Sequence, residues 1–312
     1  MRKLVVCGVD GNFGGLAASE LRELVPADMI RVTAPTAEAL AEYEAAGIET
    51  AVTNFNDPAG LAEAFAGADK VLIISMPFVG PKRRAAHKNA VDACLAANVR
   101  QVVYTSLVNA TDPENPSIEK IDHAWTEAYI QATDLDYVFL RNSQYAEAMI
   151  TAYFGSIPHG AMANNAGDGV MAFISRKDCA AAAAHVLANP YLHREVLNIN
   201  GAEAMTMAQF CDYGNAATGN DLPFRPLSDE EQYAVFDAMG VPRTTDGDFL
   251  EDSEAPFSSE GMVTFGEAIR LGKMAVCSRD FTIVTGRTPI TVAEMFADAD
   301  NFQVGARHSV DD

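Results

Sequence analysis

A glycine-rich turn between a short apolar run and a helical pattern is the feature that most constrains the fold of this chain. Leu4–Cys7 is an uninterrupted apolar run, which is typical of a strand buried on both faces of a parallel sheet. Gly8-Val9-Asp10-Gly11-Asn12-Phe13-Gly14 follows at once, and small and apolar residues then recur at helical spacing as far as Leu24. A strand that enters a helix through three glycines predicts the first unit of a parallel α/β sheet.

The alternation of apolar runs and helical patterns continues to about residue 140. Further strands are expected at Met29–Thr33, Ala51–Phe55, Val71–Ser75, Gln101–Thr105 and Tyr137–Leu140. Short connections between them favour right-handed crossovers, so the sequence predicts an α/β fold with a Rossmann-like, doubly wound parallel sheet. We expect residues 1–145 to form this domain, and residues 146–312 to form a smaller C-terminal α/β part that is interleaved with it.

Capping signals organise the second half of the chain. Thr206-x-x-Gln209, Ser228-x-x-Glu231 and Thr291-x-x-Glu294 each predict a capping box that opens a short helix. Asp178 is expected to cap the alanine-rich helix Cys179–Leu187, and Val196–Asn200 to add one more strand.

The charge balance disfavours two classes of partner. The chain has 43 Asp and Glu residues against 22 Lys and Arg, a formal net charge of −21. Such a surface repels nucleic-acid phosphates and anionic lipid, so we expect no nucleic-acid and no membrane partner. The five scattered cysteines never form CxxC and no signal-peptide pattern opens the chain, which is typical of a cytoplasmic protein. The six histidines lack paired metal-ligand spacing, so no metal site is expected.

The spacing GxxGxxG, at the first turn of the chain, predicts a dinucleotide site. Glycines let the backbone turn tightly, and the following helix offers unpaired N–H groups and a positive dipole end to a pyrophosphate. We expect NAD(P)H to be bound by Gly8, Asp10, Gly11, Asn12, Phe13, Gly14 and, at the end of the second strand, Thr33. The alternative is a tight strand–helix turn without a ligand.

Two departures from the usual pattern bear on the choice of nucleotide. The carboxylate that holds the ribose of NAD is expected about 20 residues beyond the glycines, but residues 31–36 (RVTAPT) contain none. Arg31 lies inside the strand, so the sequence predicts no preference for NADP. Asp10 stands in the turn itself, and a carboxylate about 5 Å from a phosphate opposes binding by about 3 kcal/mol at an effective dielectric of about 20. We expect Asp10 to weaken both nucleotides, unless it turns away or accepts backbone N–H bonds, and Ala34 to set the choice between them.

Several blocks in the same order resemble the NmrA-like group of atypical short-chain dehydrogenases, over about residues 3–240. The glycine turn resembles that group's TGATGxxG, with Cys7, Val9 and Asp10 as departures. The other matching blocks are Val71–Ser75, Gln101–Leu107, His123-x-x-x-Glu127 (HxxxE), Leu140-Arg141-Asn142-Ser143-Gln144-Tyr145 (LRNxxY), and Ala166-Gly167-Asp168-Gly169 with Arg176-x-Asp178 (AGDG…RxD).

The resemblance implies a Rossmann-like NAD(P) domain, a small C-terminal substrate domain, and a pocket between them for a small-molecule substrate. The cofactor-contacting residues that it implies are Ser75, Met76, Pro77, Thr105 and Ser106. The group includes NAD(P)H:quinone oxidoreductases and triphenylmethane reductases, and also non-catalytic proteins that sense the NAD(P) state. Its members often carry an Arg after the second strand, where this chain has about Ala34.

The catalytic pair of ordinary short-chain dehydrogenases is missing. None of the nine tyrosines is followed by Lys four residues later, which favours acceptors that need little acid help. His123 is the best general-acid candidate because imidazole titrates near neutrality, and the alternative is a helix-surface or capping histidine. Asn142 and Tyr145 follow a strand end, where open α/β sheets bind ligands, and the alternative for them is a polar turn.

We therefore expect a NAD(P)H-dependent reductase of a quinone or another conjugated, aromatic small molecule, acting as a monomer or a homodimer. Two alternatives stay open, namely a non-catalytic NAD(P)-sensing regulator and an enzyme that has abandoned redox chemistry on the same fold. Turnover of NAD(P)H with quinone acceptors distinguishes the reductase from both.

Overall fold

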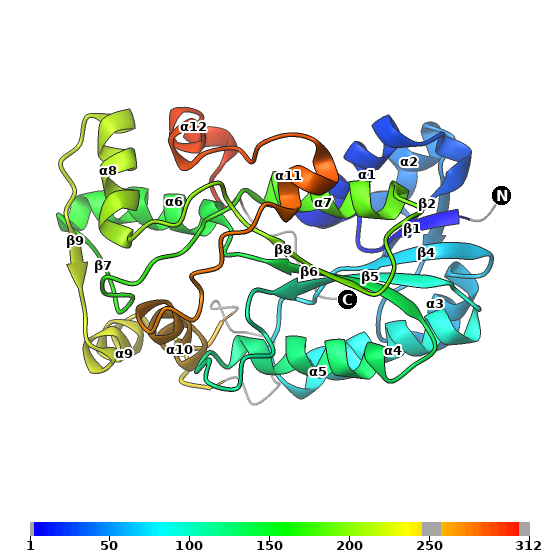
Figure 1. Cartoon of the computed structure of the whole chain (residues 1–312), viewed down its shortest axis with the longest axis horizontal. Coiled ribbons are helices and arrows are strands. Elements are labelled where there is room, and N and C mark those ends of the chain that lie inside the picture. The colour runs from blue at the N-terminus through cyan, green and yellow to red at the C-terminus, as the bar shows by residue number, and fades with distance from the viewer. Residues whose placement is uncertain (1–2, 245–256, 306–312) are drawn as a thin grey trace.

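A seven-stranded parallel sheet forms the centre of the computed structural model, which describes residues 3–244 and 257–305. The strands are β1 (Lys3–Val6), β2 (Ile30–Ala34), β3 (Glu49–Val52), β4 (Ala68–Ile73), β5 (Gln101–Leu107), β6 (Asp136–Asn142), β7 (Met162–Asn164), β8 (Glu195–Ile199) and β9 (Phe224–Pro226). The sheet has the order β3-β2-β1-β4-β5-β6-β8, and every neighbouring pair is parallel (Figure 1). The predicted Rossmann-like, doubly wound α/β fold is confirmed.

Helices cover both faces of this sheet. The helices are α1 (Asn12–Leu24), α2 (Ala41–Ala45), α3 (Pro58–Ala64), α4 (Pro81–Ala96), α5 (Glu119–Gln131), α6 (Ala146–Ser156), α7 (Arg176–Ala188), α8 (Met207–Thr218), α9 (Asp229–Ala238), α10 (Ser259–Arg270), α11 (Asp280–Thr285) and α12 (Val292–Ala297). In Figure 1, α1, α2, α7 and α11 lie on one side of the sheet, and α3, α4 and α5 lie on the other. Because side chains alternate along a strand, Val6 packs into the core under α1 and α7, whereas Val5 packs into the core under α3 and α4.

The second half of the chain forms a smaller body at one end of the sheet. It contains the two-stranded parallel sheet β7-β9 and the helices α6, α8, α9, α10 and α12 (Figure 1). Its core includes Tyr153, Phe210 and Phe296, whose rings pack with centroid distances of 5.1 Å for Tyr153–Phe296 and 5.2 Å for Phe210–Phe296. The same half also contributes α7 and β8 to the large sheet domain.

The local sequence signals predicted most element starts and missed two. All three capping boxes are present, at the N-termini of α8, α9 and α12. The cap predicted at Asp178 is wrong, because Ser175 caps α7 by accepting the Asp178 N–H, and the carboxylate of Asp178 instead accepts the N–H of Ile290 at 2.8 Å. The third strand covers Glu49–Val52 rather than Ala51–Phe55, because its pairing with β2 starts at Arg31↔Glu49 and ends at Ala34↔Val52.

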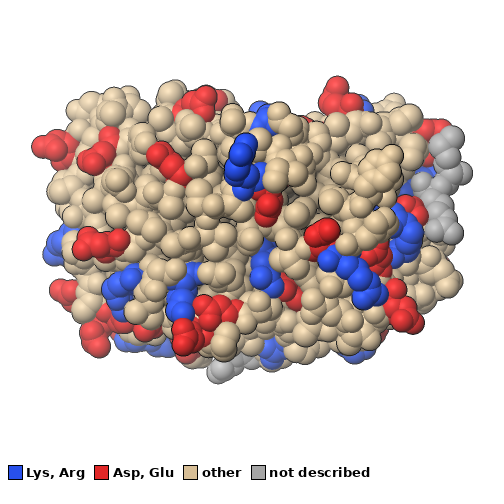
Figure 2. Space-filling view, viewed as in Figure 1, with Lys and Arg blue, Asp and Glu red and all other residues tan. Residues whose placement is uncertain are grey.

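The surface is strongly acidic but not uniformly so. On the face shown in Figure 2, Lys and Arg side chains are interspersed with Asp and Glu instead of gathering into one basic patch. No helix in the described part of the chain is long and apolar enough to cross a membrane. Within the described ranges no three His, Cys, Asp or Glu side chains are grouped so that they could hold a metal ion.

Candidate active site

The glycine turn lies where the strand order of the large sheet reverses. β1 pairs with β2 on one side and with β4 on the other, and the chain winds outward from it in both directions. Ligands of open α/β sheets bind outside the carboxyl ends of the strands at such a point. Gly8 has a φ of +64°, and a Cβ added to Gly14 would lie 2.1 Å from the carbonyl oxygen of Gly8. The fold of the turn itself therefore requires two of its three glycines.

Gly11 is not required by the fold in this way. It is the N-cap residue of α1, with φ −85° and ψ 153°, a conformation that any L-residue adopts. A Cβ added to it would meet the carbonyl oxygen of Gly8 at 3.5 Å, an ordinary contact. No side chain caps α1, so the N–H groups of its first turn are available to an anion. Open space in front of uncapped N–H groups fits the pyrophosphate of a dinucleotide.

A cavity of about 410 Å³ adjoins the turn between α1 and α2. Its lining comprises Val9, Asp10, Gly11, Asn12, Gly15, Leu16, Ser19, Arg22, Glu42 and Tyr43. One carboxylate oxygen of Asp10, Oδ1, is buried and has no hydrogen-bond partner among the residues that the structure describes. Oδ1 is therefore packed against the turn and out of reach of a ligand in the cavity. Asp10 as a whole is partly exposed and lines the cavity, so its other carboxylate oxygen, Oδ2, is the one that a ligand there would meet.

The end of β2 borders the same turn. Val9 donates its N–H to the carbonyl oxygen of Thr33 at 3.1 Å, and the Thr33 side chain is buried beneath the turn. Ala34 is 1% exposed, so a long side chain at that position would enter the core instead of reaching a ligand. Arg31 donates to the Glu49 carboxylate at 2.7 Å and to the carbonyl oxygens of Ala64 and Ala66 at 2.6 and 2.8 Å. Its guanidinium is occupied and is not a phosphate clamp.

The carboxyl ends of β4 and β5 are joined by a side-chain hydrogen bond. Ser75, two residues beyond β4, donates its N–H to Thr105 Oγ1 at 2.8 Å. Ser106, the next residue of β5, points the opposite way and donates its hydroxyl to Glu127 on α5 at 2.6 Å. Glu127 also pairs with Arg141 of β6 at 2.6 Å. The Ser106 side chain is thus held on the α5 side of the sheet, whereas the Thr105 hydroxyl stays beside the strand ends.

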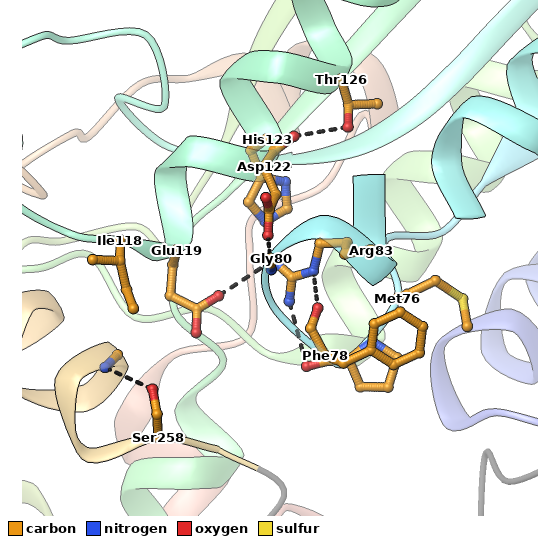
Figure 3. A network of polar contacts seen from close by, with 12 residues as sticks. Met76, Phe78, Gly80, Arg83, Ile118, Glu119, Asp122, His123, Thr126 and Ser258 are labelled. Carbon is orange, nitrogen blue, oxygen red and sulfur yellow. Dashed lines mark hydrogen bonds and ion pairs between the residues drawn. The ribbon is translucent and has the colours of Figure 1, made fainter. Parts of the chain in front are cut away.

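The loop between β4 and α4, residues 74–80, is fixed from the side of α4 and α5. Met76 donates its N–H to Nε2 of the buried His87 at 3.1 Å. Gly80 donates its N–H to the Asp122 carboxylate at 2.5 Å (Figure 3). Burial raises the pKa of Asp122, while the hydrogen bond from Gly80 opposes that shift. This loop therefore carries Met76 and Pro77 at the end of β4 in a defined conformation.

Arg83 secures the middle of the same loop. Arg83 is buried, and its guanidinium donates to the carbonyl oxygens of Phe78 and Pro77. The same guanidinium forms an ion pair with the Glu119 carboxylate at 3.3 Å (Figure 3). Burial raises the pKa of Glu119, and Arg83 opposes that shift. Through Arg83, Glu119 in the first turn of α5 is connected to the loop that follows β4.

His123 is placed beneath the strand ends and not among them. Its Nδ1 lies 3.0 Å from the hydroxyl of Tyr104, which is three residues before the end of β5, a rise of about 10 Å. Burial, assisted by the nearby Arg83 guanidinium, lowers the pKa of His123 well below its usual range. The ring is therefore neutral near pH 7, and the expected role as a cationic general acid does not fit this position.

Asn142 and Tyr145 come together at the end of β6. Asn142 Nδ2 donates to the Tyr145 hydroxyl at 3.3 Å, which leaves the phenolic O–H free to donate elsewhere. The Tyr145 ring lies 6.4 Å from the ring of Phe13, at the start of α1, and 5.3 Å from the guanidinium carbon of Arg176. Burial raises the pKa of Tyr145, so the phenol remains protonated. The turn after β1 and the end of β6 thus meet through Phe13 and Tyr145.

Sequence reasoning missed two contributors to this site. His87 is a single histidine in the helical pattern of α4, and nothing in its spacing indicates that it holds Met76. Arg176 belongs to the AGDG…RxD block, but nothing in that pattern indicates its contact with Tyr145, which depends on α7 packing against the end of β6. Two other residues could be found from the sequence, because Arg141 belongs to the LRNxxY block and Glu127 to the HxxxE block. The structure joins them as an ion pair.

A model of one protein family matches much of the chain. The family is described as NAD(P)H-binding, and the match covers residues 8–190. "Quinone oxidoreductase 2" of Escherichia coli (strain K12) is 30% identical over 274 residues, which is 87% of this chain and 93% of that protein.

Solved structures agree with this assignment. The crystal structure of a NADPH-dependent quinone oxidoreductase from Escherichia coli, complexed with NADPH, has a TM-score of 0.85 at 26% identity, covering 95% of this chain and 99% of that chain. The Citrobacter sp. triphenylmethane reductase complexed with NADP(H) has a TM-score of 0.79 at 27% identity and covers 95% of this chain and 98% of its own. Both crystals contain the phosphorylated form of the nucleotide.

Proposed function

Because this chain belongs to the NAD(P)H-binding, NmrA-like family of atypical short-chain dehydrogenases, we propose that it is a reductase of quinones or of other conjugated, aromatic small molecules. The observation that carries the proposal is the Asn142–Tyr145 pair, which presents a protonated phenol at the carboxyl ends of the strands. Its position beside Phe13 of the glycine turn supports a shared pocket for cofactor and substrate.

The cofactor is NAD(P)H, and the glycine turn fits it. The N–H groups of the first turn of α1 would hold the pyrophosphate, and the absence of a Cβ at Gly11 leaves room for it. Met76, Pro77 and Thr105 would border its other end, held in place by His87, Arg83 and Ser75. When bound, NAD(P)H supplies the hydride that a reductase transfers.

Tyr145 would act at the oxygen of the acceptor. A quinone that receives a hydride gains negative charge on an oxygen, and a preorganised O–H donor stabilises that charge. Asn142 occupies the lone-pair side of the Tyr145 hydroxyl and so orients its O–H. The proton that completes the hydroquinone comes from Tyr145 or from water, and Tyr145 then takes one back from solvent.

The chemistry of these residues suits easily reduced acceptors. Tyr145 is followed four residues later by Met149, so the Lys that lowers the pKa of a catalytic tyrosine is missing. Burial raises the pKa of this phenol, which makes it a hydrogen-bond donor more than an acid. Quinones, azo compounds and triarylmethane cations need hydride and little proton transfer in the slow step. Simple ketones need a stronger acid, so we expect them to be poor substrates.

His123 and its neighbours would serve as positioning residues. The Tyr104–His123 pair lies behind the loop after β4, whose backbone is held by His87, Asp122 and Arg83. Buried groups in fixed hydrogen bonds restrict the loop that would border the hydride-donating end of the cofactor. The C-terminal part of the chain, residues 146–312, would supply the outer wall of the substrate pocket.

Steady-state turnover tests the proposal. Oxidation of NADH and NADPH is followed at 340 nm with a benzoquinone, a naphthoquinone, an azo dye and a simple aldehyde. We expect turnover with the first three and little with the aldehyde, and a fall in kcat of about tenfold in Tyr145→Phe, equal to about 1.4 kcal/mol, without a change in the Kd of the nucleotide. Tyr191→Phe, an exposed tyrosine remote from the strand ends, is the matched control.

Failure has a defined meaning. Nucleotide binding without turnover of any acceptor would favour the NAD(P)-sensing regulator, and a partner captured only in the presence of nucleotide would strengthen that alternative. Equal turnover of quinone and aldehyde, or full activity of Tyr145→Phe, would contradict the role assigned to the phenol.

A further inference from the structure

We infer that Asp10 makes this protein selective for NADH, by accepting hydrogen bonds from the ribose of the adenosine half and by repelling the 2′-phosphate of NADPH. The inference rests on the binding of NAD(P)H at the glycine turn. It assigns to a residue of the turn the task that dinucleotide-binding folds usually give to a carboxylate at the end of the second strand.

The first step is the position of Asp10 relative to β2. The hydrogen bond from the Val9 N–H to the Thr33 carbonyl oxygen, 3.1 Å, ties the turn to the last residues of β2. Asp10 follows Val9 directly, and it lines the cavity together with Glu42 and Tyr43 of α2, the helix that comes after β2. The strand itself ends in Ala34, which is buried and supplies no acceptor. Asp10 could thus take the place of the ribose-binding carboxylate that is usual at the end of the second strand and is absent from β2.

The second step is the state of the Asp10 carboxylate. Asp10 is partly exposed and lines the cavity of about 410 Å³ between α1 and α2. Its Oδ1 is buried, so the other carboxylate oxygen, Oδ2, faces a ligand, and a carboxylate oxygen in such a place fits a hydroxyl donor. The two ribose hydroxyls of NADH are donors of that kind. A 2′-phosphate replaces one of these donors by an anion and would face a carboxylate instead.

The third step is the charge of the cavity lining, in which two carboxylates, Asp10 and Glu42, outnumber one cation, Arg22. The Arg31 guanidinium donates its hydrogen bonds to the Glu49 carboxylate and to two carbonyl oxygens. Arg22 lines the same cavity as Asp10 and is the cation of that lining. Glu42 on the facing helix is a second carboxylate in the lining. The charges beside the ribose end therefore favour a ligand without an additional phosphate.

This position differs from the effect expected from sequence alone. Repulsion of the pyrophosphate by Asp10 would weaken NADH and NADPH alike, because both carry that group. Recognition of the ribose changes their ratio, since one nucleotide offers a hydroxyl where the other has a phosphate. The ratio of the two dissociation constants therefore separates the two effects.

Titration calorimetry without any electron acceptor tests the inference. Dissociation constants are measured for NADH and NADPH, and for ADP-ribose and its 2′-phosphate, which lack the nicotinamide. We expect the native protein to bind NADH and ADP-ribose at least about tenfold more tightly than their 2′-phosphorylated counterparts, as is typical for loss of a charge-assisted hydrogen bond. Asp10→Thr should weaken NADH and strengthen NADPH, so that the ratio falls about tenfold or more. Glu23→Gln, an exposed charge on α1 that does not line the cavity, should leave the ratio unchanged.

Several results would overturn the inference. They are a native preference for NADPH, an equal gain for both nucleotides in Asp10→Thr, and a shift in Glu23→Gln as large as that in Asp10→Thr. A native preference for NADPH that disappears in Arg22→Gln would assign the 2′-phosphate to Arg22 instead. Quinone turnover is measured separately on the same samples, so a reductase with an unchanged nucleotide ratio refutes the role of Asp10 and leaves the proposed activity standing.

Discussion

Replacing Gly11 by valine should abolish nucleotide binding and leave the fold intact, and the geometry of the turn says why. Gly11 has backbone angles open to any L-residue, and an added Cβ would meet only the Gly8 carbonyl oxygen, at 3.5 Å. The side chain would instead project in front of the uncapped N–H groups of α1 and into the cavity that Gly11 lines. The pyrophosphate could then no longer reach those groups.

The size of the effect follows from the bonds that are lost. A hydrogen bond from a backbone N–H to a charged oxygen contributes about 1.5–3 kcal/mol. Losing two of them costs about 3–6 kcal/mol, so the Kd of the nucleotide should rise by about a hundredfold to ten-thousandfold. Valine is a poorer N-cap than glycine by about 1 kcal/mol, so Tm without nucleotide should fall by no more than about 4 °C.

Calorimetric titration with NADH and thermal unfolding without it provide the two readouts. Gly155→Val is a matched control, because Gly155 is an exposed residue of α6 with nothing within 4 Å of its added Cβ, and it should bind NADH as the native protein does. Gly14→Ala should instead unfold the turn, since its Cβ would lie 2.1 Å from Gly8 O. A Gly11→Val protein with native Tm and native Kd would refute the reasoning and reduce the glycine turn to a tight connection.

Three further outcomes are expected. Thr36→Arg, at an exposed position just beyond β2, should tighten NADPH alone by about tenfold in calorimetry, because only its 2′-phosphate gains a charge-assisted partner, and an equal gain for NADH would contradict this. His123→Ala should lower the free energy of unfolding in urea by about 1–3 kcal/mol by leaving the Tyr104 hydroxyl unpaired, whereas a tenfold loss of kcat/KM at native stability would restore the proton-donor hypothesis. Burial lowers the pKa of Lys70 to about 8, below its value in the unfolded chain, so this group favours folding more as pH rises through that range. The stability of the native protein relative to Lys70→Met should therefore increase by about 2 kcal/mol between pH 7 and 9.5 in urea unfolding, and a constant difference would refute the assignment.

Signals of short range account for what the sequence predicted correctly. Apolar runs such as Leu4–Cys7 identify doubly buried strands because both faces of a parallel sheet are covered by helices. The capping boxes at Thr206, Ser228 and Thr291 are confirmed because the hydrogen bonds that define them join residues three apart. The glycine turn is likewise a local property of the chain, and its position directly after the first strand is enough to indicate a dinucleotide-binding fold.

The direction and surroundings of the site residues were decided by the tertiary structure. Ser106 belongs to a strand end as expected, but strand alternation and the position of Glu127 turn its hydroxyl to the α5 side. The residue type of His123 suggests a proton donor, but its burial beside Tyr104 lowers its pKa, so the ring is neutral near pH 7. The sequence position of Asp10 does not decide whether its carboxylate faces the pyrophosphate or the ribose of the nucleotide. The bond between Val9 and Thr33 settles where the turn lies, because it fixes the turn against a strand more than twenty residues away, and pairing over such a distance depends on the packing of the whole sheet.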